Sequence, residues 1–418
     1  MKALATLINA PRLEKRIEEL AEIGKIEING VSRLAHSSKD KEAVLKVQKW
    51  MEEAGLETRI DHFGNLIGRL NGEKPNEPIL MVGSHIDSQP YGGRFDGVIG
   101  VLGAIEVIQT MGEQNTIPFR PIEVVAFSDE EGCRFNKGLF GVRGLLGRLE
   151  KGELDRTDKN GVSRREALIE FGCDPERFKE SEYDHSTIGS FIELHIEQGP
   201  VLEVAGESIG IVTGISGPLW LTVKLKGLAG HAGSVPMHMR QDALLGAAKV
   251  IVKLNELVSE NNSAPTVGTV GSLEVFPDSR NIIPEEVTFT VDLRDINEER
   301  RNQIEEKLRR EIAQIAEENN LIYEITEDTR NEPRYCSEEI INIMRAESMK
   351  MKLNTPELMS GPFHDSLAMS YVCDYGMIFV RSKGGISHNP KEYSSIEDIS
   401  LGTELLYRTV TKMVSKNQ

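Results

Sequence analysis

The chain has 418 residues, and its 49 lysines and arginines against 66 aspartates and glutamates give a formal net charge of −17. This length predicts two or three domains, because a typical domain has roughly 100–200 residues. Hydrophobic residues make up 39 % of the sequence and charged residues 28 %, which is ordinary for a globular protein and excludes global disorder. The acidic balance argues against nucleic acid and anionic membranes as partners, since both attract basic surfaces. A small anionic substrate stays possible, because a buried site can reverse the local sign.

The cysteines and the first residues bear on the cellular compartment. The four cysteines are scattered without a CxxC pair, which is typical of a reduced intracellular protein rather than of a disulfide framework. The chain becomes charged before any long apolar run, so we expect no signal peptide. No uncharged apolar stretch reaches the roughly 18 residues that a membrane span needs. We therefore expect a cytoplasmic protein with no membrane partner.

The first part of the chain alternates between helix and strand patterns. In chain order, the sequence predicts helices over 11–24 and 41–55, strands over 65–70 and 78–87, a helix over 97–111 and a strand over 121–132. The strand over 78–87 is a continuous apolar run, as in a sheet that is covered on both faces. This order predicts an α/β layout with a largely parallel sheet, in which ligand chemistry gathers at the carboxyl ends of the strands.

The segment 215–329 has a different rhythm. The sequence predicts, in order, a strand over 219–227, a helix over 241–258, strands over 266–276 and 285–295, a helix over 296–320 and a strand over 321–327. This βαββαβ order is the ferredoxin-like plan of one sheet with helices on one face. A buried strand over 376–382 then restores the α/β character. We therefore predict a catalytic domain in two pieces, 1–214 and 330–418, with a second domain inserted between them.

Histidine and aspartate lie at the end of the strand that is predicted at 78–87. In the motif GSHIDS, His85 and Asp87 are two residues apart and share a face, so Asp87 could hold the imidazole of His85 in one orientation. The alternative is a strand-end histidine that a neighbouring acid hydrogen-bonds. In YGGRFDGVIG, Asp96 lies between glycines that allow a tight backbone path just before the predicted helix. An aspartate at this position could also be only a helix cap.

Three acids lie at the end of the strand that is predicted at 121–132. In the motif FSDEEG they come directly after the apolar run IEVVAF, where negative charge is expensive unless a positive charge is near. A divalent cation would supply that charge, and a free carboxylate beside it could act as a general base. The alternative is a solvated acidic loop. Two more histidines lie near predicted strand ends: His195 on a strand in ELHIEQG, and His388 in a loop after a strand in GISHNPKE. For either histidine alone, a structural role is the alternative. Together these residues favour a ligand site at one edge of one sheet.

Six motifs occur in a fixed order along the chain. They are GSHIDS, GGRFDG, FSDEEG, ELHIEQG, GHAGSVPM and GISHNPKE. As an ordered set, over nearly the whole chain, they resemble the two-metal amidohydrolases of the M20 metallopeptidase superfamily. Within it they are most similar to the N-carbamoyl-L-amino-acid hydrolase and allantoate amidohydrolase branch. The resemblance implies a zinc-peptidase-like catalytic domain with three layers and a mixed, largely parallel sheet, and an inserted ferredoxin-like lid and dimerisation domain.

The resemblance also implies two divalent metal ions in each subunit. One ion would be held by His85, Asp96 and His195, and the other by Asp96, Glu131 and His388, so that Asp96 bridges the two. The histidine in ELHIEQG, in place of an aspartate, separates this branch from ordinary M20 peptidases. Mixed imidazole and carboxylate ligands suit Zn²⁺, Mn²⁺, Co²⁺ or Ni²⁺. Three further residues are implied to contact and orient the ligands without binding the metals themselves: Asp87, His364 and Asp365.

Glu130, beside the implied ligand Glu131, matches the general base of the family. His231 in GLAGHAGSVPM matches a residue that stabilises the oxyanion in the active site of the partner subunit of a homodimer. The alternative for His231 is an ordinary surface loop. Four residues match contacts to a small anionic substrate: Gln198, Asn281, Arg294 and Gly361. Without the resemblance, Arg294 would be a strand-end arginine paired with Asp292 or Asp295. Because the implied metal ligands and several implied substrate contacts lie on different domains, we expect the two domains to close on the substrate. The hinges would lie near 214–217 and Asn331.

The implied reaction is the hydrolysis of an N-carbamoyl-L-amino acid to the L-amino acid, ammonia and carbon dioxide. The alternatives are allantoate or another N-acyl amino acid as substrate. GMIFVRS followed by GGISHNP, with Arg381 after the buried strand, favours the carbamoylase version. Pro362 and Phe363 in SGPFHDS stand where small residues are usual, which indicates a narrower pocket or a different acyl group.

A protein of another class, which binds ligands on this fold without catalysis, is a further alternative. The presence of all five implied ligands and of Glu130 argues against it. Cys133 follows FSDEEG directly but has no base pattern of its own, so we do not expect it to be a nucleophile. The histidines without motif context are expected at the surface: His36, His62, His185 and His238.

Overall fold

The computed structural model describes residues 6–26, 29–261 and 263–416. The chain divides into two compact units. The first comprises residues up to Thr213 and from Cys336 onward, and the second is Gly214–Tyr335. A search of the described ranges for a helix that is long and apolar enough to cross a membrane finds none.

A mixed sheet forms the centre of the first unit, and only its edge at 214–215 and 334–335 falls within the range of the second unit. Its strand order is β1 (Glu57–Ile60), β2 (Leu66–Leu70), β4 (Ile122–Phe127), β3 (Ile79–His85), β5 (Ile188–Ile196), β16 (Asp374–Val380), β6 (Ile209–Ile215) and β14 (Arg334–Tyr335), with β15 (Glu357–Ser360) paired to β6. The four central strands, β4, β3, β5 and β16, run parallel, whereas β1, β2, β6 and β14 pair antiparallel. The prediction of a mixed α/β fold with a parallel centre is thus confirmed.

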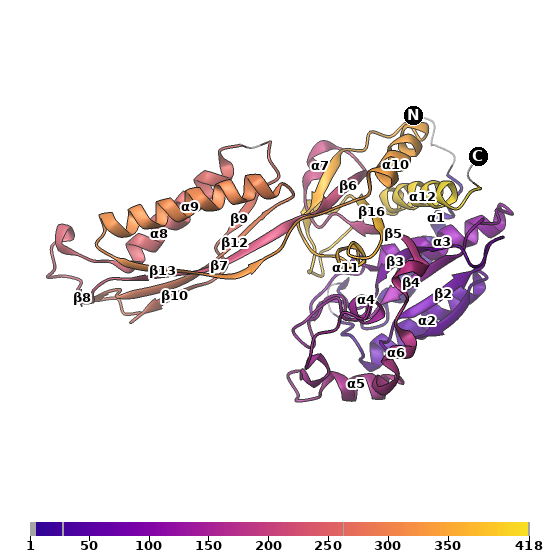
Figure 1. The fold of residues 1–418 in the computed structure, drawn as a ribbon, viewed down its shortest axis with the longest axis horizontal. Coiled ribbons are helices and arrows are strands. Elements are labelled where there is room, and N and C mark those ends of the chain that lie inside the picture. The colour runs from indigo at the N-terminus through magenta and orange to yellow at the C-terminus, as the bar shows by residue number, and fades with distance from the viewer. Residues whose placement is uncertain (1–5, 27–28, 262, 417–418) are drawn as a thin grey trace. The chain divides into compact units, whose positions relative to one another are not determined.

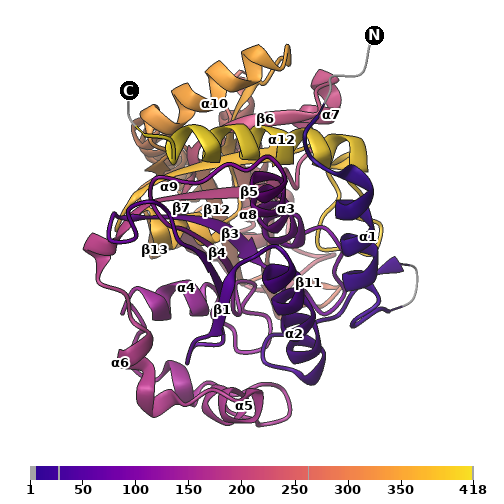
Figure 2. The same cartoon turned by 90° about the vertical axis from the view of Figure 1, so that its right-hand side faces the viewer.

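The central strands are buried along almost their whole length because helices cover both faces of the sheet. Every residue of β3 and β4 is buried. Helices α3 (Val98–Glu113) and α12 (Ile396–Met413) pack on one side and α4 (Phe140–Leu145) on the other (Figure 2). The other helices of this unit are α1 (Ala10–Ala21), α2 (Ser38–Glu53), α5 (Arg164–Phe171), α6 (Phe178–Ser181), α7 (Val201–Ala205), α10 (Glu338–Lys350) and α11 (Asp365–Met369). Strands β3 and β4 approach closely at Gly83, where a Cβ atom would lie 1.9 Å from the Val125 oxygen.

The second unit is an antiparallel sheet with two helices on one face (Figure 1). Its elements are β7 (Gly217–Lys226), α8 (Ala243–Ser259), β9 (Val267–Thr269), β10 (Leu273–Phe276), β12 (Glu286–Asp295), α9 (Glu298–Glu318) and β13 (Ile322–Arg330). The predicted element order is present, except that the strand expected at 266–276 is split into β9 and β10. Alternate residues of β7, among them Leu219, Leu221 and Val223, face the apolar core with α8 and α9. A small ribbon pairs β8 (Gly230–His231) with β11 (Ile282–Ile283).

Two details differ from the sequence predictions. The strand expected at 121–132 ends at Phe127, so that the acids of FSDEEG lie in the loop beyond it. His36, expected at the surface, is buried, and its Nε2 lies 2.6 Å from the Ser128 hydroxyl oxygen. The ring edges of Phe140 and Phe171 pack against it, because a neutral imidazole is half apolar and fits an aromatic core.

Candidate dinuclear metal site

Five candidate ligands converge at the carboxyl edge of the parallel strands. His85 is the last residue of β3, and His195 is the penultimate residue of β5. Asp96 lies two residues before α3, and Glu131 and His388 lie in the loops after β4 and β16. Parallel strands bring their carboxyl ends to one edge of a sheet, so side chains far apart in sequence meet there.

The ligand atoms form two groups that share one carboxylate. In the first group, Asp96 Oδ1 lies 3.0 Å from His195 Nε2 and 3.9 Å from His85 Nε2. In the second, Asp96 Oδ2 lies 3.1 Å from His388 Nε2, which is 3.6 Å from Glu131 Oε2. Within each group the ligand atoms are all within 4.8 Å of one another. Asp96 therefore turns one oxygen to each group, as the two-metal hypothesis requires.

The backbone fixes the tautomer of two of these histidines. Nδ1 of His85 lies 3.1 Å from the Asp87 carbonyl oxygen, and Nδ1 of His195 lies 2.9 Å from the Ile196 carbonyl oxygen. A carbonyl oxygen can only accept, so each Nδ1 carries a proton, and each Nε2, on the side of Asp96, is the nitrogen whose lone pair can bind a cation once no proton occupies it. A lone pair that is held in this way is what an imidazole ligand needs. The donor set therefore fits a divalent cation.

The carboxylate of Asp87 supports the acidic loop rather than the histidine ring. Its two oxygens accept the backbone N–H groups of Glu130 and Glu131, each at 3.3 Å. The sequence suggested that this carboxylate orients His85, but its nearer oxygen is 3.6 Å from Nδ1, farther than the Asp87 carbonyl. Asp129, the residue before Glu130, adopts a left-handed φ of 54°. Its carboxylate pairs with the buried Arg164 at 2.8 Å. The loop that carries Glu130 and Glu131 is thus held from two sides.

The electrostatics of the site show a deficit of positive charge. Burial raises the pKa of Glu131 to about 7, and the neighbouring Asp96 adds to the effect. Burial likewise raises the pKa of Glu130 well above its usual range, although His85 opposes the rise. Burial would also raise the pKa of Asp96, but hydrogen bonds from His195 and His388 outweigh it and hold that pKa well below its usual range. Divalent cations relieve such a deficit directly.

Other residues singled out in the first unit lie around this centre. Gln198 Nε2 donates to Asp96 Oδ2 at 3.0 Å, and its own Oε1 is buried without a hydrogen-bond partner in the described part of the chain. His364 is buried, with its ring centroid 4.3 Å from that of His195. Both carboxylate oxygens of Asp365 are buried and have no hydrogen bond to any residue that the structure describes. Gly361 lies in the loop after β15.

The second unit holds the remaining predicted residues. His231 is exposed on β8, and its neighbour Ala232 donates its N–H to the Asn281 carbonyl oxygen at 2.9 Å, so these two candidates are close. Arg294 lies on β12 and donates from Nε and Nη2 to Asp292, at 2.9 Å and 2.7 Å. The alternative that the sequence left open, a pair with Asp292, is thus present. Such a pair does not exclude a second carboxylate, since a guanidinium has five donors.

Sequence reasoning missed a further acid, Glu392. It is 5 % exposed, and its Oε1 accepts the backbone N–H groups of Phe95 at 2.9 Å and Asp96 at 3.1 Å. Its Oε2 lies 2.9 Å from the hydroxyl of Ser387, which is itself 3.2 Å from Asp96 Oδ2. Glu392 therefore braces the shared aspartate and the loop of His388 together. Its place at the end of the motif GISHNPKE was the one signal for it.

Two histidine–carboxylate groups around one shared aspartate, at the edge of a mixed sheet, form a donor set of the kind that metal-dependent hydrolases use. The sequence model of peptidase family M20/M25/M40 matches residues 81–412, and the chain belongs to this family.

Relatives of known name extend over nearly the whole chain. It is 48 % identical to an N-carbamoyl-L-amino-acid amidohydrolase of Pseudomonas sp. (strain NS671) and 42 % identical to one of Geobacillus stearothermophilus. Each match covers 97 % of this chain and 99 % of the relative. An allantoate deiminase of Arabidopsis thaliana is 36 % identical, over 92 % of this chain and 79 % of the relative. The solved structure of a hydantoinase/carbamoylase family amidase of Burkholderia multivorans matches with a TM-score of 0.91 at 33 % identity, covering 98 % and 99 % of the two chains.

The two hydrogen bonds that Asp87 accepts give a first prediction. We expect Asp87→Ala to lower metal affinity by about 10–100-fold, the usual effect of removing a residue that orients ligands, because the loop of Glu131 loses its anchor. Metal content after dialysis, measured by inductively coupled plasma mass spectrometry, checks this. Asp184→Ala, which removes an exposed carboxylate that only caps a short helix, is the control. Full metal content in Asp87→Ala would contradict the assignment.

Proposed function

We propose that this protein hydrolyses N-carbamoyl-L-amino acids to the L-amino acid, ammonia and carbon dioxide. The observation that carries the proposal is the shared aspartate: Asp96 turns one oxygen to each ligand group, with Glu130 Oε2 at 3.7 Å from His85 Nε2. The substrate class rests on the names of the relatives at 48 % and 42 % identity. One water molecule is consumed for each molecule of substrate, and the carbamoyl carbon leaves as carbon dioxide.

The five converging side chains would hold two divalent cations: His85, Asp96 and His195 the first, and Asp96, Glu131 and His388 the second. When bound, such ions polarise a carbonyl group and lower the pKa of a water molecule. Imidazole and carboxylate donors suit Zn²⁺, Mn²⁺, Co²⁺ and Ni²⁺ alike.

Glu130 is the proposed general base. It takes the proton of the attacking water and passes it to the first leaving nitrogen, which departs as a neutral amine or ammonia. The carbamic acid that remains then loses carbon dioxide, and its own proton moves to the second nitrogen as that C–N bond breaks. Two features suit Glu130 to this role. Its carboxylate is next to the candidate ligands without belonging to either group, and its pKa is raised by burial, so that it holds a proton more readily than an exposed glutamate. The hydrogen bond from its N–H to Asp87 keeps the side chain at the site.

The residues of the second unit are proposed to recognise the substrate. Arg294 would hold the α-carboxylate with two parallel hydrogen bonds, for which a guanidinium is suited. His231 and Asn281 would donate to the developing oxyanion, with His231 acting in the partner subunit of a homodimer. Gln198 and the backbone of Gly361 would add contacts from the first unit. We also propose that residues 215–329 act as a lid and that the protein is cytoplasmic.

A panel of substrates tests the proposal. We expect the purified protein with Mn²⁺ to release ammonia from N-carbamoyl-L-methionine, with kcat/KM at least ten-fold above that for allantoate and for N-acetyl-L-methionine. N-carbamoyl-D-methionine is the control for nonspecific hydrolysis. A higher kcat/KM on allantoate would show instead the activity of an allantoate deiminase, the name of its relative at 36 % identity. Metal-free, inactive protein would instead favour a binding role.

The role of Glu130 gives a separate prediction. Glu130→Gln keeps the size of the side chain but cannot accept the proton, so we expect kcat to fall by about 10²–10⁴-fold with both metal ions retained. Glu131→Gln is the matched comparison, because it changes the neighbouring residue and is expected to lose metal as well. Parallel measurements of kcat and metal content separate the two effects. A Glu130→Gln variant with wild-type kcat would show that another group is the base.

A further inference from the structure

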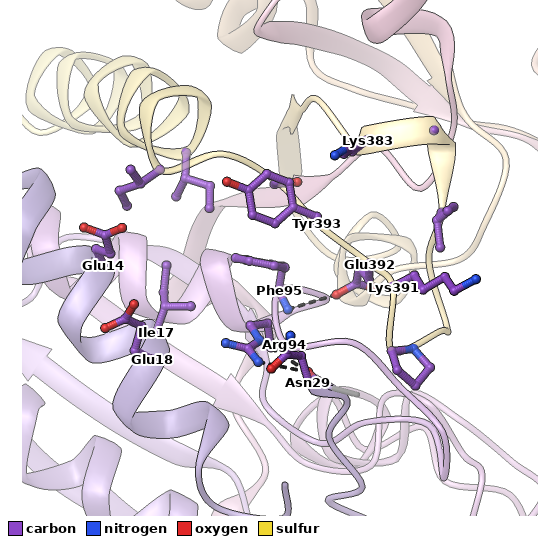
Figure 3. Close-up of a pocket in the computed structure, with 16 residues that line it drawn as sticks. Glu14, Ile17, Glu18, Asn29, Arg94, Phe95, Lys383, Lys391, Glu392 and Tyr393 are labelled. Carbon is purple, nitrogen blue, oxygen red and sulfur yellow. Dashed lines mark hydrogen bonds between the residues drawn. The ribbon is translucent and has the colours of Figure 1, made fainter. Parts of the chain in front are cut away.

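A cavity of about 680 Å³ lies in the first unit, apart from the candidate ligands (Figure 3). Helix α1, the segment before α3 and the segment 383–399 line it. Apolar side chains form much of its wall: Ile17, Phe95, Ile386, Pro390, Ile396 and Ile399. Its size is within the range of small-molecule sites, roughly 300–1,000 Å³. None of the five candidate metal ligands lines it, so the cavity is separate from the candidate metal site.

The charged residues of this cavity are balanced and stand on different sides. Glu14 and Glu18 are four residues apart on one face of α1, whereas Lys383 and Lys391 come from the segment after β16, on the opposite side (Figure 3). Arg94 adds a third cation and donates to the Asn29 carbonyl oxygen at 3.0 Å. Together with Glu392, the lining has three acidic and three basic side chains.

The charges on α1 and on Lys383 are not paired within the described part of the chain, whereas Glu392 and Arg94 form hydrogen bonds. Among the residues that the structure describes, neither Glu14 nor Glu18 forms an ion pair, and the Lys383 ammonium faces only the ring of Tyr393, at 5.8 Å from its centroid. An anion would meet the acids of α1, and a cation would meet the basic side. A small zwitterion with an apolar body satisfies both sides and covers the apolar wall.

We propose that this cavity binds a free α-amino acid with an apolar side chain. Its ammonium group lies against Glu14 and Glu18, its carboxylate against Lys383 on the opposite side, and its side chain against the apolar wall that includes Phe95. The class of ligand follows from the cavity. The proposed function supplies only the choice of probe, since such an amino acid would be its product.

The cavity shares its wall with the metal site. Phe95, which lines the cavity, directly precedes Asp96. Glu392, also in the lining, accepts the backbone N–H groups of both residues, and its other oxygen is 2.9 Å from the Ser387 hydroxyl, next to His388. A ligand that packs on Phe95 therefore presses on the backbone that positions the shared aspartate. Occupancy is expected to change turnover without displacing the substrate.

Calorimetric titration of the metal-loaded protein with L-methionine tests the proposal. The variant Glu14→Gln/Glu18→Gln removes the acidic side of the cavity. Its matched control, Glu19→Gln/Glu22→Gln, removes two charges at the same helix from side chains that pair with Lys46 and Lys25 instead. We expect the wild type and the control to bind one more L-methionine per chain than the Glu14→Gln/Glu18→Gln variant, or at least ten-fold more tightly at that site. L-Methioninol, which lacks the carboxylate, and 4-(methylthio)butanoate, which lacks the ammonium, should each bind at least ten-fold more weakly.

Equal stoichiometry and equal Kd in the wild type and in Glu14→Gln/Glu18→Gln would overturn the proposal, as would equal binding of the three probes. Kinetics give a second readout. Added L-methionine should change kcat in the wild type but not in Glu14→Gln/Glu18→Gln, whose kcat without it should stay within two-fold of wild type. A purely competitive effect in both proteins would place all binding in the active site. Failure of the proposed function would appear as no release of ammonia from any N-carbamoyl amino acid. The heat of L-methionine binding does not depend on turnover, so the two failures can be distinguished.

Discussion

The site depends on one electrostatic constraint, the burial of several carboxylates around Asp96 at the end of a parallel sheet. Asp96 itself is 7 % exposed, and Glu130 and Glu131 are largely shielded from water, so their charges lose hydration that protein dipoles replace only in part. Three imidazoles face the same point but are neutral when they serve as ligands. The two divalent cations that we propose would resolve this imbalance, and the surrounding residues would then serve as supports for their ligands.

The fold supplies the rigidity that such a centre needs. His85 and His195 sit on neighbouring buried strands, and their Nδ1 atoms face backbone carbonyls, so neither ring can turn freely. The chain passes so close to His85 that a Cβ at Gly97 would lie 2.4 Å from its Nε2, and φ there is 66°, which favours glycine. Glu392 then ties Asp96 to the loop of His388. The acidic net charge of −17 thus includes a few carboxylates that the proposed chemistry requires.

The sequence was informative where chemistry and periodicity coincide. The buried strands and the motifs at their ends predicted the mixed sheet, and the structure brings His85, Asp96, Glu131, His195 and His388 together as the motifs implied. Residues that act through tertiary contacts were not predictable. Arg164 carries no motif and becomes the partner of Asp129 only because α5 folds back on the loop. His36 is buried by aromatic rings that lie about 100 residues or more along the chain, which no local pattern records.

The metal stoichiometry of the purified protein tests the central claim, that Asp96 is shared, most directly. Inductively coupled plasma mass spectrometry should find two divalent ions per chain in the wild type and one in His388→Ala, because only the second group loses a ligand. Asp96→Ala should retain neither ion, since both groups lose the same residue, while its circular dichroism stays that of the wild type. An Asp96→Ala protein that is folded and keeps one tightly bound ion, as His388→Ala does, would contradict the account.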